Sequence, residues 1–117
     1  MNSYELLRGA SQMEVNFYQA GCKNFFKKHV QQTGLIKSRI TAAIDQERLT
    51  GMSKVKLASR HRVNGCPVYE FRLNLGKIGS ARLAFTVANE QATVYFISSK
   101  LQKSFFSHDV ERVIGCL

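Results

Sequence analysis

Three stretches of alternating apolar and polar residues follow one another between residues 67 and 103, and they constrain the fold of this chain most. They occupy residues 68–75, 81–87 and 92–98. The apolar positions are Tyr69, Phe71, Leu73 and Leu75 in the first stretch, Ala81, Leu83, Phe85 and Val87 in the second, and Val94 and Phe96 in the third. Strict alternation is typical of strands with one face buried. The pattern therefore predicts three consecutive strands of one sheet.

Short turn sequences join these three predicted strands in chain order. Gly-Lys-Ile-Gly occupies residues 76–79, and Asn-Glu occupies residues 89–90. Glycine and asparagine accept the positive φ values that hairpin turns need. We therefore expect neighbouring strands to pair antiparallel, and a two-residue turn at 89–90 places Arg82 beside Ile97.

The polar side of this predicted sheet carries two neighbouring arginines. If the apolar faces agree, Arg72 and Arg82 lie side by side on the outer face, with Tyr95 within their reach. Like charges placed side by side on a sheet reduce stability. Such a pair is tolerable if Glu70 offsets the charge, and it is useful if an anion binds there.

The rest of the chain predicts an α+β fold, with helices on one sheet face. We expect a first strand at 13–18, a helical hairpin of helices at 21–30 and 35–49, an extended segment with an Asn-Gly turn within 52–66, and a last helix at 107–117. The apolar face of the first helix is predicted to include Val30, Thr33 reads as a cap or turn residue, Gly51 as a helix end and Ser107 as an N-cap. Residues 1–12 are expected to be an N-terminal extension of a single domain at 13–117.

Composition narrows the class of protein. The chain has 117 residues, 44% of them hydrophobic, which suits one domain with its own core. No apolar run approaches the roughly 20 residues that span a bilayer, and the N-terminus does not resemble a signal peptide. We therefore expect a cytoplasmic protein without a membrane partner. Three cysteines at unrelated positions give no metal-ligand spacing, so neither a metal nor another cofactor is predicted.

The charge of the chain is strongly positive and unevenly placed. The formal net charge is +9, and nine Lys and Arg residues lie between residues 54 and 103 against only Glu70 and Glu90. Such a concentration on a small domain favours a polyanion partner, usually RNA or DNA. An acidic protein partner and a merely solvated basic face are the alternatives.

A nucleic-acid interface on the outer face would use cations and one aromatic ring. The predicted binding residues are Lys54, Lys56, Arg60, Arg62, Tyr95 and Lys100. Arginine forks match phosphate oxygens, lysines add point charges, and an exposed aromatic ring stacks on a base.

The same face holds candidates for RNA cleavage by attack of the 2′-hydroxyl. That reaction needs a base, cations that stabilise the charge on the phosphorane, and an acid for the leaving oxygen. The predicted catalytic residues are Glu70 and His108 for proton transfer, Arg72 and Arg82 for charge stabilisation, and Lys103, together with Lys100, for phosphate positioning. Between two arginines, Glu70 is expected to orient them more than to act as a base.

Three motifs in this order resemble a known family. Val-Tyr-Glu-Phe-Arg-Leu at 68–73, Ala-Arg-Leu-Ala-Phe-Thr-Val at 81–87 and Ser-Lys-Leu-Gln-Lys-Ser at 99–104 are similar to segments of HigB/RelE-type toxins of bacterial toxin–antitoxin pairs. The resemblance implies a RelE/ParE-like fold, with a helical hairpin on one face of a mainly antiparallel sheet and a short C-terminal helix. It also implies working residues at Arg72, Arg82, Lys100 and Lys103, with His108 aligned more loosely.

The function implied by this resemblance is that of a toxin which inhibits translation as a ribosome-dependent mRNA endoribonuclease. Its partners would be a cognate antitoxin, mRNA and the ribosome. The sequence departs from the family at Ser99, where lysine is common, and at Phe105 and Phe106, where some members carry a catalytic tyrosine or a proline. These departures keep open a non-enzymatic member, either a ParE-like poison of DNA gyrase or an inactive nucleic-acid- or protein-binding module.

Overall fold

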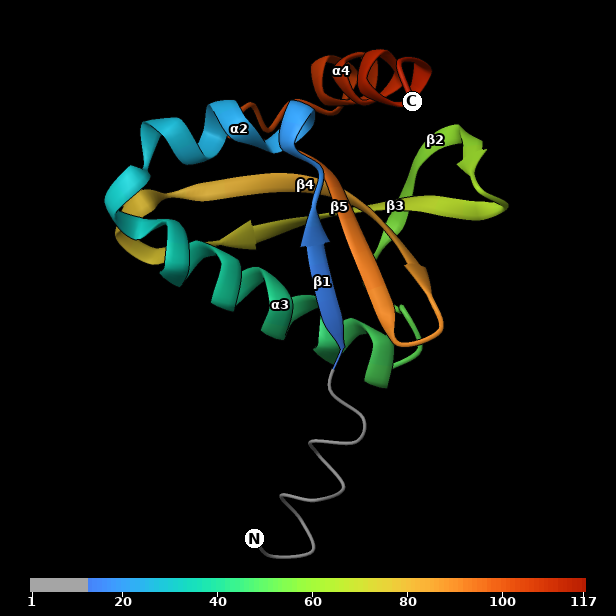
Figure 1. The fold of residues 1–117 in the computed structure, drawn as a ribbon, viewed down its shortest axis with the longest axis horizontal. Coiled ribbons are helices and arrows are strands. Elements are labelled where there is room, and N and C mark those ends of the chain that lie inside the picture. Colours follow the sequence, from blue (N-terminus) through green and yellow to red (C-terminus); the bar gives the residue numbers. More distant parts are fainter. Residues whose placement is uncertain (1–12) are drawn as a thin grey trace, which may run out of the picture.

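The computed structural model describes residues 13–117, which form a five-stranded mixed sheet and three α-helices (Figure 1). In chain order the elements are β1 (Glu14–Phe17), α2 (Gln19–Lys28), α3 (Thr33–Leu49), β2 (Lys56–Val63), β3 (Cys66–Asn74), β4 (Ser80–Ala88), β5 (Gln91–Ser98) and α4 (Lys103–Gly115), with 3-10 turns at Val30–Gln32 and Gly76–Ile78. The α+β prediction is confirmed. The predicted extension at residues 1–12 lies outside the described residues.

The strands lie in the order β1-β5-β4-β3-β2. β1 pairs parallel to β5, and the other three pairs are antiparallel. Tight turns close two of the hairpins, and the φ values of Asn64, Gly65 and Asn89 are 51°, 80° and 59°. The three predicted strands and the Asn-Gly and Asn-Glu turns are therefore confirmed.

One irregularity in the β4–β5 pair changes which side chains share a face. Thr86 pairs with Thr93, as a two-residue turn requires, but the register shifts between Ala84 and Phe85. Beyond this bulge Arg82 pairs with Ser98 rather than with Ile97, so the predicted register is wrong there. The extra residue sends Ile97 into the core under the first two helices and leaves Tyr95 and Phe96 on the opposite face.

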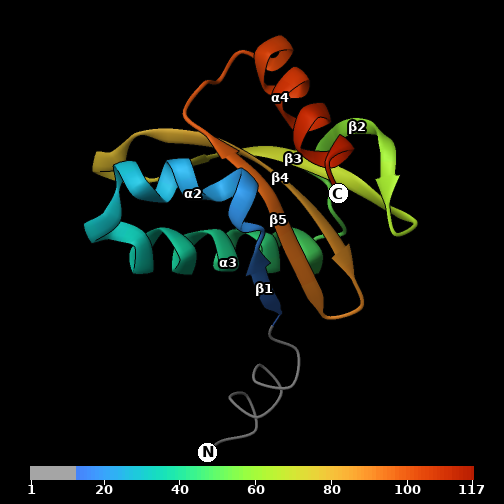
Figure 2. The same ribbon diagram turned by 45° about the horizontal axis from the view of Figure 1, so that its top comes forward.

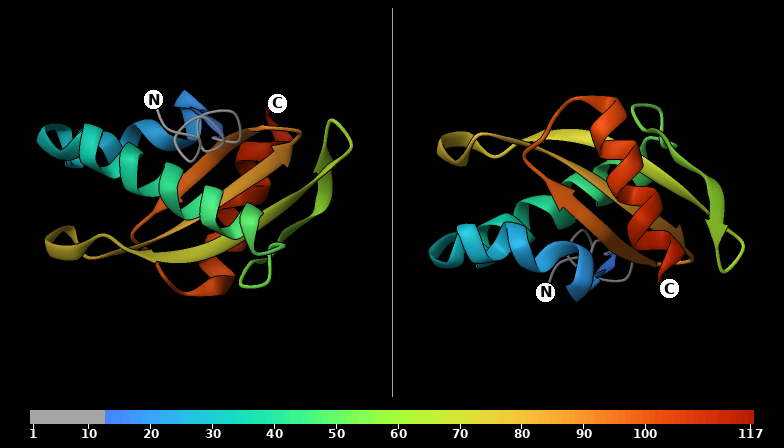
Figure 3. Two further views of the ribbon diagram at one scale, coloured as in Figure 1. Left: turned by 90° about the horizontal axis from the view of Figure 1, so that it is seen from below. Right: turned by 90° about the horizontal axis from the view of Figure 1, so that it is seen from above.

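One face of the sheet packs against α2 and α3 in an apolar core (Figure 3, left). The buried helix residues are Cys22, Phe25, Ile36, Ile40 and Ile44, and they meet Leu75, Ala81, Leu83, Phe85, Ala92, Val94 and Ile97 of the sheet region. α2 also lies beside β5 (Figure 2). At their closest approach, a Cβ added to Gly21 would lie 1.7 Å from the carbonyl oxygen of Tyr95, so this position excludes a side chain.

The two ends of the helical hairpin differ from the prediction in detail. Val30 is 73% exposed in a 3-10 turn and does not extend the apolar face of α2. The Thr33 hydroxyl donates back to the Val30 carbonyl at 3.1 Å, so Thr33 begins α3 without capping it.

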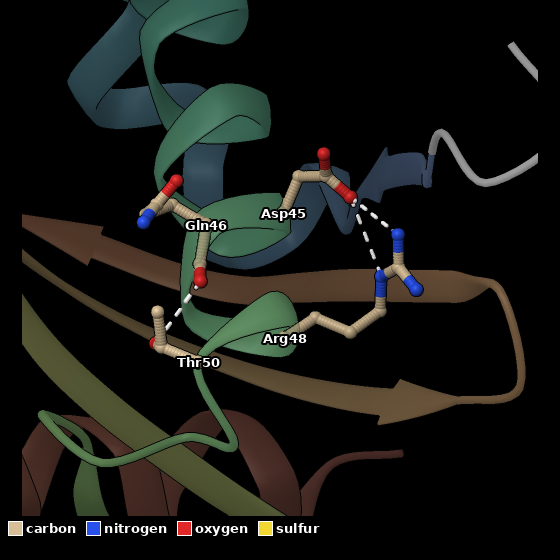
Figure 4. A network of polar contacts seen from close by, with 4 residues as sticks. All are labelled: Asp45, Gln46, Arg48 and Thr50. Carbon is tan, nitrogen blue, oxygen red and sulfur yellow. Dashed lines mark hydrogen bonds and ion pairs between the residues drawn. The ribbon is translucent and has the colours of Figure 1, made fainter. Parts of the chain in front are cut away.

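The C-terminal end of α3 is fixed by local polar contacts (Figure 4). The Thr50 hydroxyl donates to the Gln46 carbonyl at 3.1 Å, and Arg48 pairs with Asp45 at 2.8 Å. Gly51 follows with a φ of 76°, which confirms that it ends the helix.

The opposite face of the sheet is covered by α4 (Figure 3, right). Phe106, Val110 and Ile114 pack on Ala58, Val68, Ala84 and Tyr95. The helix begins at Lys103 and not at Ser107, because Phe106 is fully buried and anchors an additional turn against the sheet. The predictions that all helices lie on one face and that the outer face is open are therefore wrong. Among residues 13–117, no helix is both long enough and apolar enough to cross a membrane.

Candidate nucleic-acid interface

A buried carboxylate organises the charged part of the sheet beside α4. Glu70 lies in β3 and is only 1% exposed. Its Oε1 atom accepts a hydrogen bond from the Arg82 guanidinium at 2.7 Å and lies 3.3 Å from the Lys103 ammonium. One carboxylate oxygen thus holds two cations, one from β4 and one from the first turn of α4.

The ion pair is not saturated. Within the described part of the chain, Glu70 Oε2 and Arg82 Nε are buried without a hydrogen-bond partner. The Arg82 guanidinium also lies 5.8 Å from the centre of the Phe106 ring. Burying a charge is costly unless it is paired. The arrangement therefore fixes Arg82 and Lys103 in place, while the exposed fractions of their side chains, 18% and 53%, leave them accessible to solvent.

Two further cations extend this group at the surface. The strand register places Arg72 directly beside Arg82 and Lys56 directly beside Glu70, so each pair shares a face. Arg72 and Lys56 are exposed, and among residues 13–117 neither side chain forms a salt bridge or hydrogen bond. We call Lys56, Arg72, Arg82 and Lys103, with Glu70 beneath them, the basic cluster. The predicted neighbourhood of Arg72 and Arg82 is confirmed.

The basic cluster has the chemistry of an anion site. Four cations surround one carboxylate, so the local charge is positive and an anion would relieve the repulsion between the arginines. Arginine forks bind phosphate oxygens in pairs, and lysine contributes a point charge. Glu70 is sealed from solvent, so it can orient Arg82 and Lys103 but cannot reach a substrate proton. Glu70 was expected near the arginines at the surface, and the structure corrects its position to the interior.

Tyr95 does not serve as an exposed stacking ring. It is 9% exposed, and its ring centre lies 5.6 Å from that of Tyr18. Tyr95 lies on the predicted face of the sheet, but Phe106, Val110 and Ile114 of α4 pack over that face and bury it. Its predicted place on an open surface is therefore wrong.

His108 is not part of the basic cluster. It is exposed and lies two residues from both Phe106 and Val110, which are fully buried against the sheet. A step of two residues in a helix turns the side chain by roughly 200°. His108 therefore points away from the sheet, and the structure does not bring it together with Arg82 or Lys103.

The remaining predicted binding residues are spread along the molecule. Lys54, Arg60 and Lys100 are exposed. Arg62 donates to the Gly65 carbonyl at 3.1 Å and so belongs to the β2–β3 turn. Arg62 follows Lys56 by six residues on β2, a distance of roughly 20 Å along a strand. These cations broaden the positive surface without converging on Glu70.

A second polar group attaches α4 to the edge strand β2, and no local motif predicts it. Glu111 accepts a hydrogen bond from the Ser59 hydroxyl at 2.6 Å, and its other oxygen lies 2.9 Å from His61 Nδ1. The Ser59 hydrogen bond, followed by the contact with His61, lowers the pKa of Glu111. Serine and histidine both face the carboxylate rather than each other, so this is a fastening between elements and not a nucleophilic triad.

Within residues 13–117 no three histidine, cysteine or acidic side chains gather closely enough to hold a metal ion. Comparison of the chain with protein-family models, with curated proteins and with solved structures finds no match. The proposed function therefore rests on the basic cluster.

Proposed function

We propose that this chain is an RNA-cleaving toxin that binds the phosphates of messenger RNA at the basic cluster. The observation that carries the proposal is the buried Glu70 carboxylate, which holds Arg82 and Lys103 at 2.7 and 3.3 Å beside the exposed Arg72. Preorganised cations that need no rearrangement are what stabilisation of a phosphorane requires. The β-α-α-β-β-β-β-α order also suits the RelE/ParE-like fold that the sequence motifs suggest.

In this proposal three cations of the cluster have separate tasks. Arg72 binds the scissile phosphate from the solvent side, because its side chain is exposed. Arg82, fixed by Glu70, neutralises the charge that develops when the 2′-hydroxyl gives its proton to solvent water and attacks the phosphorus, with release of the 5′-oxygen. Lys103 is half exposed at the start of α4 and is placed to donate a proton to the leaving 5′-oxygen. Glu70 is a positioning residue.

The expected setting of this activity is the cytoplasm, with the ribosome presenting the message and a cognate antitoxin covering the basic face. The surrounding cations Lys54, Arg60 and Lys100 suit contacts with further RNA phosphates, whether these belong to message or to ribosomal RNA.

A non-catalytic function is the second candidate, and one observation favours it. Neither residue that was predicted for proton transfer is available as a general base at the basic cluster: Glu70 is sealed, and His108 lies on the far side of α4. A member of the same superfamily that poisons DNA gyrase, or one that binds nucleic acid or protein without cleaving, would need only the cations.

Induced expression in bacteria with mapping of messenger RNA 5′ ends tests the proposal. Arg72→Ala is the decisive variant, because Arg72 is exposed and its loss leaves the Glu70–Arg82 pair intact. Lys77→Ala, in the exposed β3–β4 turn, is the matched control. We expect new 5′ ends within coding regions for the wild type and the control, and a decrease of about 10²-fold for Arg72→Ala, the usual effect of removing one transition-state donor.

Growth arrest with intact messages would refute cleavage and support the gyrase candidate. Intact messages without growth arrest would leave a binding module.

A further inference from the structure

A second surface suited to a nucleotide lies on the other side of α4 from the basic cluster. A groove of about 500 Å³ runs between α2 and α4 over the end of β5. Figure 3 (right) shows the two helices flanking β5 there. This volume is within the range of small-ligand sites. Sequence reasoning did not find it, because its walls come from the two ends of the chain.

The rim of this groove is positively charged. Its lining residues include Lys28, Lys100 and Arg112, with Asp109 as the one acidic side chain among those that line it in the described chain. Arg112 lies 4.0 Å from Asp109 and is 73% exposed, so this surface pair is weak and leaves guanidinium N–H groups available. The rim therefore favours an anionic ligand.

The interior of the groove is aromatic. Tyr18 and Phe96 line it and are both partly exposed. Phe105, which is 58% exposed, does not line the groove but shares a helix face with Asp109 and Arg112, four and seven residues further along α4. Aromatic rings beneath a cationic rim are what an unpaired nucleotide requires, since the rings stack on the base and the cations hold the phosphate.

The groove and the basic cluster are neighbours across the start of α4. Ser98 lines the groove and is the strand partner of Arg82. Phe96, also in the groove, packs on Phe106 at 5.6 Å, and Arg82 lies over the other ring of that pair. An RNA strand that runs from the basic cluster across residues 99–102 would pass Lys100 and then enter the groove.

We infer that the groove between α2 and α4 holds an unpaired nucleotide of the RNA strand whose neighbouring phosphate is bound at the basic cluster. The inference rests on the proposed function and adds a subsite to it. The nucleotide base packs on Tyr18 and Phe96, and its phosphate is held by Lys28, Lys100 and Arg112.

Two adjacent lysines of α2 provide a matched pair for testing this subsite. Lys28 lines the groove, whereas Lys27 has the same charge, is exposed and does not line it. With a labelled, unstructured oligouridylate at low salt, we expect Lys28→Ala to weaken binding by about three- to tenfold, a typical effect of losing one phosphate contact. Lys27→Ala should change affinity less than twofold. Equal effects of the two substitutions would overturn the subsite.

Cys116 offers an independent footprint, because it lines the groove and is exposed. In a Cys66→Ser background the only other thiol besides Cys116 is Cys22. Burial raises the pKa of the Cys22 thiol to about 12 and keeps it unreactive. Bound oligouridylate should slow alkylation of Cys116 several-fold. Unchanged alkylation at saturating RNA would overturn the inference. Protection by a short glutamate-rich peptide but not by RNA would also overturn it, and would identify a protein-binding groove instead.

Failure of the subsite is distinguishable from failure of the proposed function. If Arg72→Ala weakens RNA binding but Lys28→Ala does not, and RNA does not protect Cys116 from alkylation, then RNA binds at the basic cluster and the groove proposal is wrong. If the protein does not bind RNA at all, both are wrong.

Discussion

The two faces of the sheet bury different kinds of side chain. The face under α2 and α3 packs on a large apolar core, which includes Ile36, Ile40 and Ile44. The face under α4 has a smaller apolar core, and next to it a buried glutamate that holds two cations. An apolar contact is the simpler way to stabilise a sheet, since a buried ion pair gains little over apolar residues of similar volume. The charged arrangement is therefore better explained by function than by stability.

Two buried glutamates make the same contrast. Glu47, at the end of α3, is 7% exposed and accepts a hydrogen bond from the backbone N–H of Lys54 at 3.0 Å, which fastens a loop. Glu70 is 1% exposed and holds side-chain cations instead, and its second oxygen has no hydrogen-bond partner among residues 13–117. A backbone partner serves the fold, whereas side-chain cations form a site that another anion can share.

The largest expected effect comes from removing the buried carboxylate. Glu70→Ala leaves Arg82 without its counter-ion, and we expect the free energy of unfolding to fall by about 3–5 kcal/mol. Urea denaturation at neutral pH measures the change. The double variant Glu70→Met/Arg82→Leu should recover most of the loss, because the buried charges are removed together. A loss below about 1 kcal/mol in the single variant would show that Glu70 is not effectively buried.

A cavity in the core beneath α2 and α3 should reduce stability without changing RNA affinity. Ile40 is fully buried in α3, and Ile40→Ala is expected to lower the free energy of unfolding by about 2–5 kcal/mol. Leu49→Ala, at the exposed end of the same helix, should change it by less than about 0.5 kcal/mol. RNA affinity, measured on the folded Ile40→Ala protein, should match the wild type. A weaker affinity would mean that the two faces are not separate in function.

The contact of α2 with β5 should tolerate no added atom. Gly21→Ala places a Cβ against the backbone of Tyr95, and we expect a loss of about 1–3 kcal/mol from overpacking. Gly34 is the matched control, because a Cβ there meets nothing within 4 Å. Gly34→Ala should stabilise α3 slightly. Similar thermal midpoints for the two variants would argue against the close approach.

The smallest effect concerns the attachment of α4 to β2. The pKa of Glu111 lies below its ordinary value of 4.5, so its contribution to stability is fully present above that pH and is lost as the pH falls through the lowered pKa. The contact is partly exposed, and we expect less than about 1 kcal/mol. Urea midpoints of Glu111→Gln should lose this acid dependence, whereas those of Glu90→Gln, in the exposed β4–β5 turn, should keep it.

The hairpins could be predicted from sequence because their information is local. Alternation marks β3, β4 and β5, and asparagine and glycine mark two of the turns, which is enough to place Arg72 beside Arg82. The site was predicted less well, because its geometry depends on distant contacts. No residue pattern within 81–98 predicts the bulge that changes the faces of Phe96 and Ile97, and no local pattern predicts that Phe106 packs α4 across the sheet over Tyr95.

The claim that one face of the sheet is a phosphate site is tested most directly by the salt dependence of RNA affinity. For Arg72→Ala, the slope of log affinity against log salt should become shallower by about 0.7, the contribution of one phosphate contact on single-stranded RNA. Arg39→Ala removes the same charge from the exposed side of α3, on the opposite face, and should leave the slope unchanged. Equal slopes for the two variants would contradict the account, because RNA affinity would then depend on the net charge of the protein and not on the position of each charge.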